Sequence, residues 1–284
     1  MSDTAIDKEA LRREVDEALH GQKKESVAPS GFELNANSRV KHVIGVVSGK
    51  GGVGKSLVAG ILATNLMRAG KRVGILDGDI TGPSIPKMFG LSGVHAHGEN
   101  DQLVPVSEAR GIKIMSANLV LQNETDPVLW RGPVVAGAIQ QFYGQCNWGS
   151  LDYLLIDMPP GTGDVALTVF QSIPVEGIVI VSSPQDLVQM VVGKAVKMAD
   201  MMGIRVLGLV ENMGYVQCPH CDQKIEPFGP SHLEDTAADF GIPALGQLPI
   251  DPVFSKLSDE GTFSTDLPHD LIPHATECVL DLDR

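Results

Sequence analysis

The sequence predicts an α/β domain with a mostly parallel sheet that is covered by helices on both faces. From residue 42 onward, apolar runs of strand length that are rich in β-branched residues alternate with stretches of helical length and periodicity. These runs are apolar throughout rather than at every second position, which is typical of strands buried on both faces. Strands joined by helices in this way favour a parallel sheet over an all-β or all-α fold.

Seven strands are expected, and helices separate several of them. The strands are expected at residues 42–48, 72–77, 112–117, 152–157, 177–183, 205–212 and 244–250. The clearest helices are KSLVAGILATNLMRA, which follows the first strand, then VVAGAIQQFYG and QDLVQMVVGKAVKMADMM. Helical length and periodicity distinguish these three from the short apolar runs.

The domain organisation follows from where this alternation begins and breaks. Residues 1–40 are expected to form a short helix and a linker, because only a narrow apolar stripe marks the helix. Residues 41–284 are expected to form the α/β domain. The periodicity is lost at about residues 216–232, VQCPHCDQKIEPFGPSH, which predicts an inserted loop there.

The composition excludes some classes of binding partner and indicates the cellular compartment. The formal net charge of −13 argues against nucleic acid and anionic membranes, because the summed field repels both. No signal-peptide core and no apolar stretch of ~18 residues is evident, so a cytoplasmic protein is expected. Four cysteines in 284 residues are too few for a disulfide scaffold and fit a reducing compartment.

A phosphate-binding loop connects the first strand to the first helix. The pattern G-x-x-x-x-G-K-[ST] is met by Gly49, Lys50, Gly51, Gly52, Val53, Gly54, Lys55 and Ser56. The glycines let backbone N–H groups turn toward phosphate oxygens, and the N-terminus of the helix adds its positive end. Lys55 would reach the β- and γ-phosphates of ATP, and Ser56 would ligate Mg²⁺. The sequence therefore predicts a P-loop NTPase.

Carboxylates follow two other predicted strands. LDGDITGPS places Asp77 at the end of one strand and Asp79 two residues later, and LLIDMPPGTGD places Asp157 at the end of another. Parallel strands end at one edge of a sheet, so these groups are expected beside the P-loop, where Mg²⁺ needs oxygen ligands and ordered water. Gly161 lies in a loop that is expected to bring a backbone amide near the γ-phosphate.

Seven motifs resemble one family. They are KGGVGKS, DGDITGPS, VLWRGPVV, LDYLLIDMPPGTGD, SSPQDLV, ENMGYVQCPHC and LPIDP, and they extend from about residue 40 to residue 262. The extra lysine in KGGVGKS resembles the deviant P-loop ATPases of the MinD and ParA superfamily. The seven motifs together resemble its Mrp branch, the iron–sulfur cluster carrier ATPases.

The resemblance implies a role for each site residue. Two subunits would meet across their nucleotides as a homodimer, and Lys50 would reach the phosphates bound by the partner, as an arginine finger does. Asp79 would orient the attacking water, and Asp77 and Asp157 would support Mg²⁺ through its water ligands. Asn212 would hydrogen-bond the adenine, which only the match of ENM to the family indicates.

Cys218 and Cys221 form a C-x-x-C pair, which can place two thiolates on one metal ion or cluster. Two copies of the chain would supply four thiolates to one 4Fe-4S cluster. The resemblance implies that such a cluster is labile and is passed to apo-proteins. The other two cysteines, Cys146 and Cys278, are isolated in the sequence and are expected to be unliganded.

Other functions remain open at this stage. Four cysteines of a dimer could hold zinc instead, which would make the protein a zinc-bridged regulatory ATPase. A zinc site within one chain would have to recruit His220 or His232, and a redox dithiol is less favoured because no helix is expected to begin at the pair. A MinD- or ParA-like positioning ATPase would need a basic surface or tail, whereas the chain ends in HATECVLDLDR.

Overall fold

The structure is a computed structural model, and it describes the chain from Glu33 onward with short gaps. The described residues are 33–80, 82, 84–99, 102–121, 132–184, 188–221, 223–269 and 271–284. The predicted N-terminal helix lies outside them and stays a prediction, whereas Arg39 and Val40, at the end of the predicted linker, belong to the first strand. In the described part of the chain, none of the helices combines the length and the apolarity that crossing a bilayer requires.

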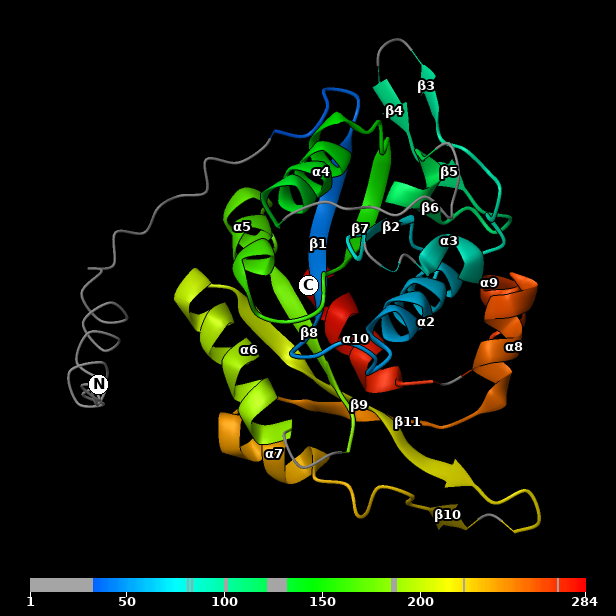
Figure 1. The fold of residues 1–284 in the computed structure, drawn as a ribbon, viewed down its shortest axis with the longest axis vertical. Helices are drawn as coiled ribbons and strands as arrows, with labels where there is room; N and C mark the ends of the chain where they lie inside the picture. Colours follow the sequence, from blue (N-terminus) through cyan, green and yellow to red (C-terminus); the bar gives the residue numbers. More distant parts are fainter. Residues whose placement is uncertain are drawn as a thin grey trace, which may run out of the picture. The chain divides into compact units, whose positions relative to one another are not determined.

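A sheet of nine strands forms the centre of the described chain (Figure 1). Its order is β10–β9–β8–β1–β7–β2–β6–β5, and β11 also pairs with β9. The bounds are β1 Arg39–Ser48, β2 Val73–Asp77, β5 Val106–Ser107, β6 Lys113–Met115, β7 Ser150–Asp157, β8 Gly177–Ser182, β9 Arg205–Gln217, β10 Lys224–Ile225 and β11 Ala244–Pro249. Only β5 and β10 pair in antiparallel fashion within this sheet. A separate hairpin joins β3 (His97–Glu99) to β4 (Gln102–Val104).

Helices cover both faces of this sheet (Figure 1). One layer contains α2 (Lys55–Arg68), α3 (Ile85–Met88), α8 (Pro252–Glu260), α9 (Phe263–Asp266) and α10 (Pro273–Leu280). The other contains α4 (Gly132–Gln145), α5 (Asp164–Ser172), α6 (Val188–Met202) and α7 (Leu233–Phe240). Two short 3₁₀ helices, η1 (Ala117–Leu119) and η2 (Asp281–Asp283), complete the elements.

The central strand β1 shows why helices must pack on both faces of the sheet. Ile44 and Val46 join the apolar cluster on the α2 side, whereas Val43 and Val47 join the cluster on the α4 side. Successive side chains of a strand point to opposite faces, so a run that is apolar throughout must be buried twice. The predicted fold class, a mostly parallel sheet between two helical layers, is confirmed.

The chain order around β1 creates a switch point at the carboxyl edge of the sheet. From β1 the chain passes through α2 to β2, which lies beyond β7, and from β7 it passes through α5 to β8 on the other side of β1. The two crossovers run in opposite directions across the sheet, and the crevice outside such strand ends is where α/β proteins bind ligands. The P-loop follows β1 at this edge, where Asp77 and Asp157 are the last residues of β2 and β7.

One predicted strand differs from the structure in a way that affects the cysteines. The strand expected at 205–212 is β9, which continues to Gln217 and turns back antiparallel into β10. Of the segment predicted as an inserted loop, Val216 and Gln217 end β9 and Lys224 and Ile225 form β10, so the cysteines lie in the turn of a hairpin. This hairpin extends away from the body of the sheet (Figure 1).

Candidate nucleotide site and cysteine pair

The P-loop turns sharply between β1 and α2. Gly52 and Gly54 have φ angles of 79° and 83°, in the left-handed region that favours glycine. Gly54 is also the residue that precedes the first turn of α2. The Ser48 hydroxyl donates to the Lys50 carbonyl at 2.9 Å, which fixes the start of the turn. The loop thus turns at positions where glycine is favoured over residues with a side chain.

Lys55, the P-loop lysine, is held by a buried carboxylate. Its Nζ pairs with Asp157 Oδ1, and the Ser56 hydroxyl donates to Asp157 Oδ2 at 2.5 Å. Lys55 is only 5% exposed, and Asp157 is fully buried at the end of β7. Ser56 and Asp157 together present the oxygen donors that suit Mg²⁺.

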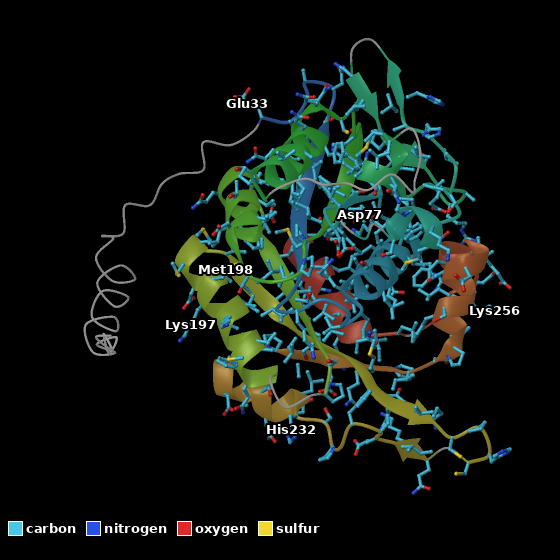
Figure 2. The ribbon with its side chains drawn as sticks, viewed as in Figure 1. Glu33, Asp77, Lys197, Met198, His232 and Lys256 are labelled. Atoms are coloured by element: carbon cyan, nitrogen blue, oxygen red, sulfur yellow. The ribbon has the colours of Figure 1, made fainter. Side chains whose placement is uncertain are left out.

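Asp77 lies directly beside Asp157, because the two residues are register partners on β2 and β7. Asp77 is fully buried in the interior of the chain (Figure 2). Its carboxylate accepts from the Ser116 hydroxyl and from the backbone amide of Asp79, both at 3.2 Å. Ser116 was not predicted as a site residue. The available signal was a polar residue near the end of the apolar strand expected at residues 112–117.

Burial raises the pKa of both carboxyl groups. Desolvation and the neighbouring charge of Asp157 raise the pKa of Asp77 to about 8. Desolvation also raises the pKa of Asp157, and Lys55 opposes this rise. Two carboxyl groups beside one ammonium therefore titrate as a unit, and a divalent cation would favour the ionised form of both.

The remaining P-loop-side residues lie at the same edge. Asp79 is half-buried just after β2, and Lys50 is half-buried within the P-loop. Gly161 differs from expectation, because its N–H donates to the Ser48 carbonyl at 2.9 Å instead of facing a phosphate. With φ at 92°, Gly161 instead anchors the loop after β7 to the end of β1.

Asn212 contacts the P-loop from β9. Its Nδ2 donates to the Val53 carbonyl at 2.9 Å, while its Oδ1 is buried and has no hydrogen-bond partner among the described residues. A buried acceptor without a partner is costly, which fits a group that receives a ligand donor. The structure thus gives Asn212 a geometric argument that the sequence lacked.

Gly54→Ala is expected to lower the affinity for ATP at least about tenfold, or about 1.4 kcal/mol. A Cβ on Gly54 would lie 2.0 Å from Asn212 Nδ2, and the φ angle of 83° disfavours any L side chain. Isothermal titration with ATP measures the effect. Gly70→Ala is the matched control, because Gly70 has φ of 78° but nothing within 4 Å of its Cβ position. Equal ATP affinity in the two variants would contradict the prediction.

The cysteine pair lies at the turn between β9 and β10. The Cys218 amide donates to the Gln223 carbonyl at 3.0 Å, and the Gln223 amide donates to the Cys221 carbonyl at 2.7 Å. Cys221 is exposed and Cys218 is half-buried. Hydrogen bonds from the His220 backbone and from Cys221 lower the pKa of the Cys218 thiol, which favours the thiolate that ligates metals.

The described residues offer no third ligand near this pair. Among them, no group of three or more His, Cys, Asp or Glu side chains is arranged to hold a metal ion. The geometry therefore lends no support to a zinc site completed by His220 or His232.

The other two cysteines lie apart from this pair. Cys146 is buried, which raises its pKa to about 12, and the Cys278 thiol donates to the Leu207 carbonyl at 3.4 Å.

Fold and site together define a nucleotide-binding P-loop protein. The chain belongs to the ParA-type family described as the NUBPL iron-transfer P-loop NTPases, whose model matches residues 39–279. The predicted resemblance to iron–sulfur cluster carrier ATPases is thereby confirmed at the level of the family.

Known relatives agree with this assignment. An iron–sulfur cluster carrier protein of Clostridium perfringens is 48% identical over 229 residues, which are 78% of this chain and 80% of that protein. The protein of the same description from Methanocaldococcus jannaschii is 43% identical over 240 residues, 84% of this chain and 83% of that protein.

Solved structures show the same fold. A nucleotide-binding protein of Archaeoglobus fulgidus, in complex with ADP and with cobalt found, is 44% identical, with a TM-score of 0.72 over 81% of this chain and 90% of that chain. The cell-division ATPase MinD of Pyrococcus furiosus is 21% identical, with a TM-score of 0.59 over 85% and 99% of the two chains, and it shows the fold alone.

Proposed function

We propose that the protein is a cytoplasmic ATPase that binds a labile 4Fe-4S cluster across a homodimer and transfers it to apo-proteins. The observation that carries this proposal is an accessible C-x-x-C pair at a hairpin turn, on a chain that also presents a P-loop. The pair supplies two of the four thiolates that a cluster needs. The reported relatives described as iron–sulfur cluster carriers support the same cargo.

The P-loop and the carboxylates would hold ATP and Mg²⁺. Lys55 would turn from Asp157 to the β- and γ-phosphates, and Ser56 would ligate the metal, which neutralises developing charge on the phosphates. Asp77 and Asp157 would accept hydrogen bonds from the water ligands of Mg²⁺. The A. fulgidus relative, solved with ADP, supports nucleotide binding at this fold.

Asp79 and Asn212 would complete the site. Asp79 follows β2 at the open edge, where it would orient the water that attacks the γ-phosphate. Asn212 would accept a hydrogen bond from the adenine amino group through its buried Oδ1, which has no partner among the described residues. Nδ2 of the same side chain would keep its bond to the P-loop.

A second copy of the chain would complete both sites. A two-fold axis brings the same surface of two subunits together, so two hairpins would present four cysteines to one cluster. The partner's cysteines are the simplest source of ligands, because the described residues of one chain offer no third donor.

The decisive measurement is the metal and acid-labile sulfide content of protein purified without oxygen. The proposal expects about four iron and four sulfide per dimer. About one zinc per dimer without sulfide would instead identify the zinc-bridged regulatory ATPase, which uses the same four thiolates. A monomer with empty cysteines after reconstitution with iron and sulfide would refute both.

Lys50→Ala is expected to retain ATP binding but to lose ATP-dependent association, with turnover reduced at least about tenfold. The reason is that Lys50 would neutralise phosphate charge in the partner's site rather than in its own. Sedimentation velocity and phosphate release measure the two effects. Lys256→Ala, on the exposed face of α8, is the control. Unchanged turnover in Lys50→Ala would contradict a role across the dimer.

A further inference from the structure

Two consecutive residues of β9 connect the nucleotide loop to the cysteine hairpin. Asn212 bonds the Val53 carbonyl of the P-loop at 2.9 Å. Its neighbour Glu211 makes contacts elsewhere, with Ser231 and Gln247. Successive side chains of a strand point in opposite directions, so one short piece of backbone carries both contacts.

Glu211 is a buried acidic residue, only 1% exposed. Its Oε1 accepts from the Ser231 hydroxyl at 2.8 Å and from Gln247 Nε2 at 2.7 Å. Buried carboxylates are rare unless hydrogen-bonded, and these two bonds come from different elements. Removal of either bond would leave a buried acceptor less satisfied.

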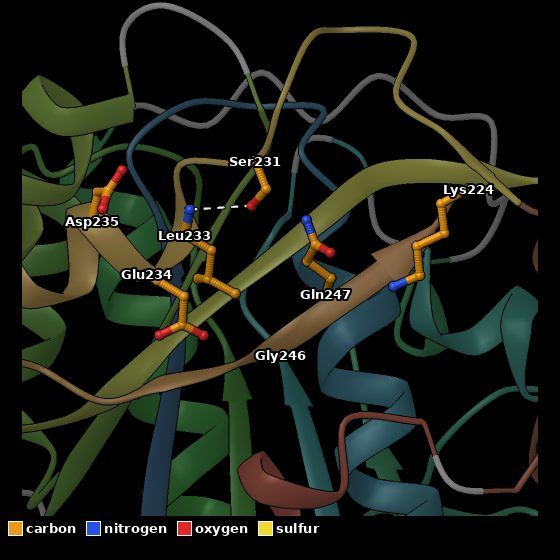
Figure 3. Close-up of a pocket in the computed structure, with 7 residues that line it drawn as sticks. All are labelled: Lys224, Ser231, Leu233, Glu234, Asp235, Gly246 and Gln247. Atoms are coloured by element: carbon orange, nitrogen blue, oxygen red, sulfur yellow. Dashed lines mark hydrogen bonds between the residues drawn. The ribbon is translucent and has the colours of Figure 1, made fainter.

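Ser231 ends the segment that returns from the hairpin. β10 ends at Ile225, and the chain reaches Ser231 just before α7. The Ser231 hydroxyl also accepts from the Leu233 amide at 3.2 Å, which Figure 3 shows as a dashed line. Ser231 and Gln247 line one pocket with Lys224 of β10, so the pocket joins the hairpin to β11.

The strand is irregular immediately after these two residues. Gln247 of β11 pairs with Glu211, but Pro249 pairs with Tyr215, so three residues of β9 oppose one of β11. Within this bulge Met213 has a φ angle of 62°, which is unusual for a residue other than glycine. Bulges bend a strand locally, so a shift at Asn212 would be passed on as a change in the direction of the hairpin.

We propose that Glu211 is a positioning residue that couples the nucleotide site to the cysteine hairpin. Closure of the P-loop around ATP moves the Val53 carbonyl and Asn212, and Glu211 transfers this movement through Ser231 to the returning segment. Cys218 and Cys221 are thereby presented differently with and without nucleotide. The inference rests on the proposed function, because it assumes that ATP binds at the P-loop.

The test measures thiol alkylation in the reduced full-length protein that holds no cluster, with and without ATP and Mg²⁺. Peptide mass spectrometry follows the labelling of Cys218 and Cys221, with Cys278 as an internal reference. The wild-type rate is expected to change at least about fivefold with ATP, and Ser231→Ala to reduce this change to less than about twofold. Glu211→Gln keeps an accepting oxygen and is expected to retain the wild-type change, whereas Glu211→Ala is expected to lose it.

Glu234→Gln is the matched control, because Glu234 lines the same pocket from the first turn of α7. The ATP dissociation constants of Ser231→Ala and the control are expected to stay within about twofold of the wild type, since neither residue lies at the P-loop. If ATP changed the alkylation rate of Ser231→Ala as much as that of the wild type, the inference would be overturned. Pairing of subunits alone would then account for the effect of ATP on the cysteines. The absence of any change in a wild type that binds ATP would also overturn the inference. Failure of the wild type to bind ATP would refute the proposed function itself.

Discussion

Lys55→Ala is expected to reduce ATP turnover by about 10³-fold, because the cation that reaches the phosphates is removed. The same change is expected to destabilise the folded chain by about 3 kcal/mol, since it leaves Asp157 buried without its ammonium partner. Asp157 and Asp77 would then lose the ammonium that offsets their charges, and proton uptake would neutralise the pair.

This loss of stability has a defined pH dependence. Without Lys55 the pKa of Asp157 rises further, so the folded state takes up a proton that the unfolded state releases. Folding stability then falls as the pH rises, and the deficit relative to the wild type is larger at pH 8 than at pH 5. Urea unfolding at the two pH values measures it. An equal deficit at both would show that the buried carboxylate is not its source.

Two variants control for the loss of a lysine in general. Lys71→Ala breaks the partly exposed pair with Asp283, which is expected to cost no more than about 1 kcal/mol and to leave turnover unchanged. The double variant Lys55→Ala, Asp157→Asn removes both buried charges, so it is expected to recover part of the stability and none of the turnover. Full turnover in Lys55→Ala would contradict the assignment of the P-loop.

The double variant Cys218→Ala, Cys221→Ala is expected to lose iron–sulfur binding completely. The two thiols lie on one hairpin turn, and the described residues supply no third ligand that could hold a cluster in their place. After anaerobic reconstitution with iron and sulfide, the visible absorbance and the iron content are expected to fall below about a tenth of the wild-type values.

The cysteine variant separates cargo binding from nucleotide binding. ATP affinity is expected to be unchanged, because Cys218 lies beyond the bulge of β9 and has no place in the P-loop site. Cys278→Ala is the control, since its thiol bonds the Leu207 carbonyl between β9 and α10. Visible absorbance that persists in the double variant would show that other residues hold the cluster.

The local parts of the fold could be predicted from the sequence. The apolar runs indicated the strands, and strands that end with Asp77 and Asp157 predicted that the two carboxylates meet. That prediction succeeded because parallel strands end at one edge whatever their order in the sheet. The order itself, with β7 between β1 and β2, depends on contacts between distant segments and left no local signal.

Two of the missed features are contacts over long sequence distances, and the third is the length of a strand. Asn212 and Val53 are 159 residues apart, and nothing near either residue predicts their hydrogen bond. The length of β9 was underestimated because Met213 and Gly214 interrupt its apolar pattern. Gly161 was expected near a phosphate from its place in the loop after a strand, whereas in this structure the Ser48 carbonyl accepts its amide hydrogen.

Asn212 lies in β9, Cys218 directly follows the end of this strand, and the bulge at Met213 lies between them. Six residues of fully extended chain span about 20 Å, which is an upper bound for this bulged segment. Dissolved ions screen charge over about 8 Å under physiological conditions, so the field of a triphosphate reaches the thiols of the same chain only weakly. The hydrogen bonds on either side of the bulge depend little on ionic strength, so the proposed coupling through the backbone is expected to persist at salt concentrations that screen the charge of the nucleotide.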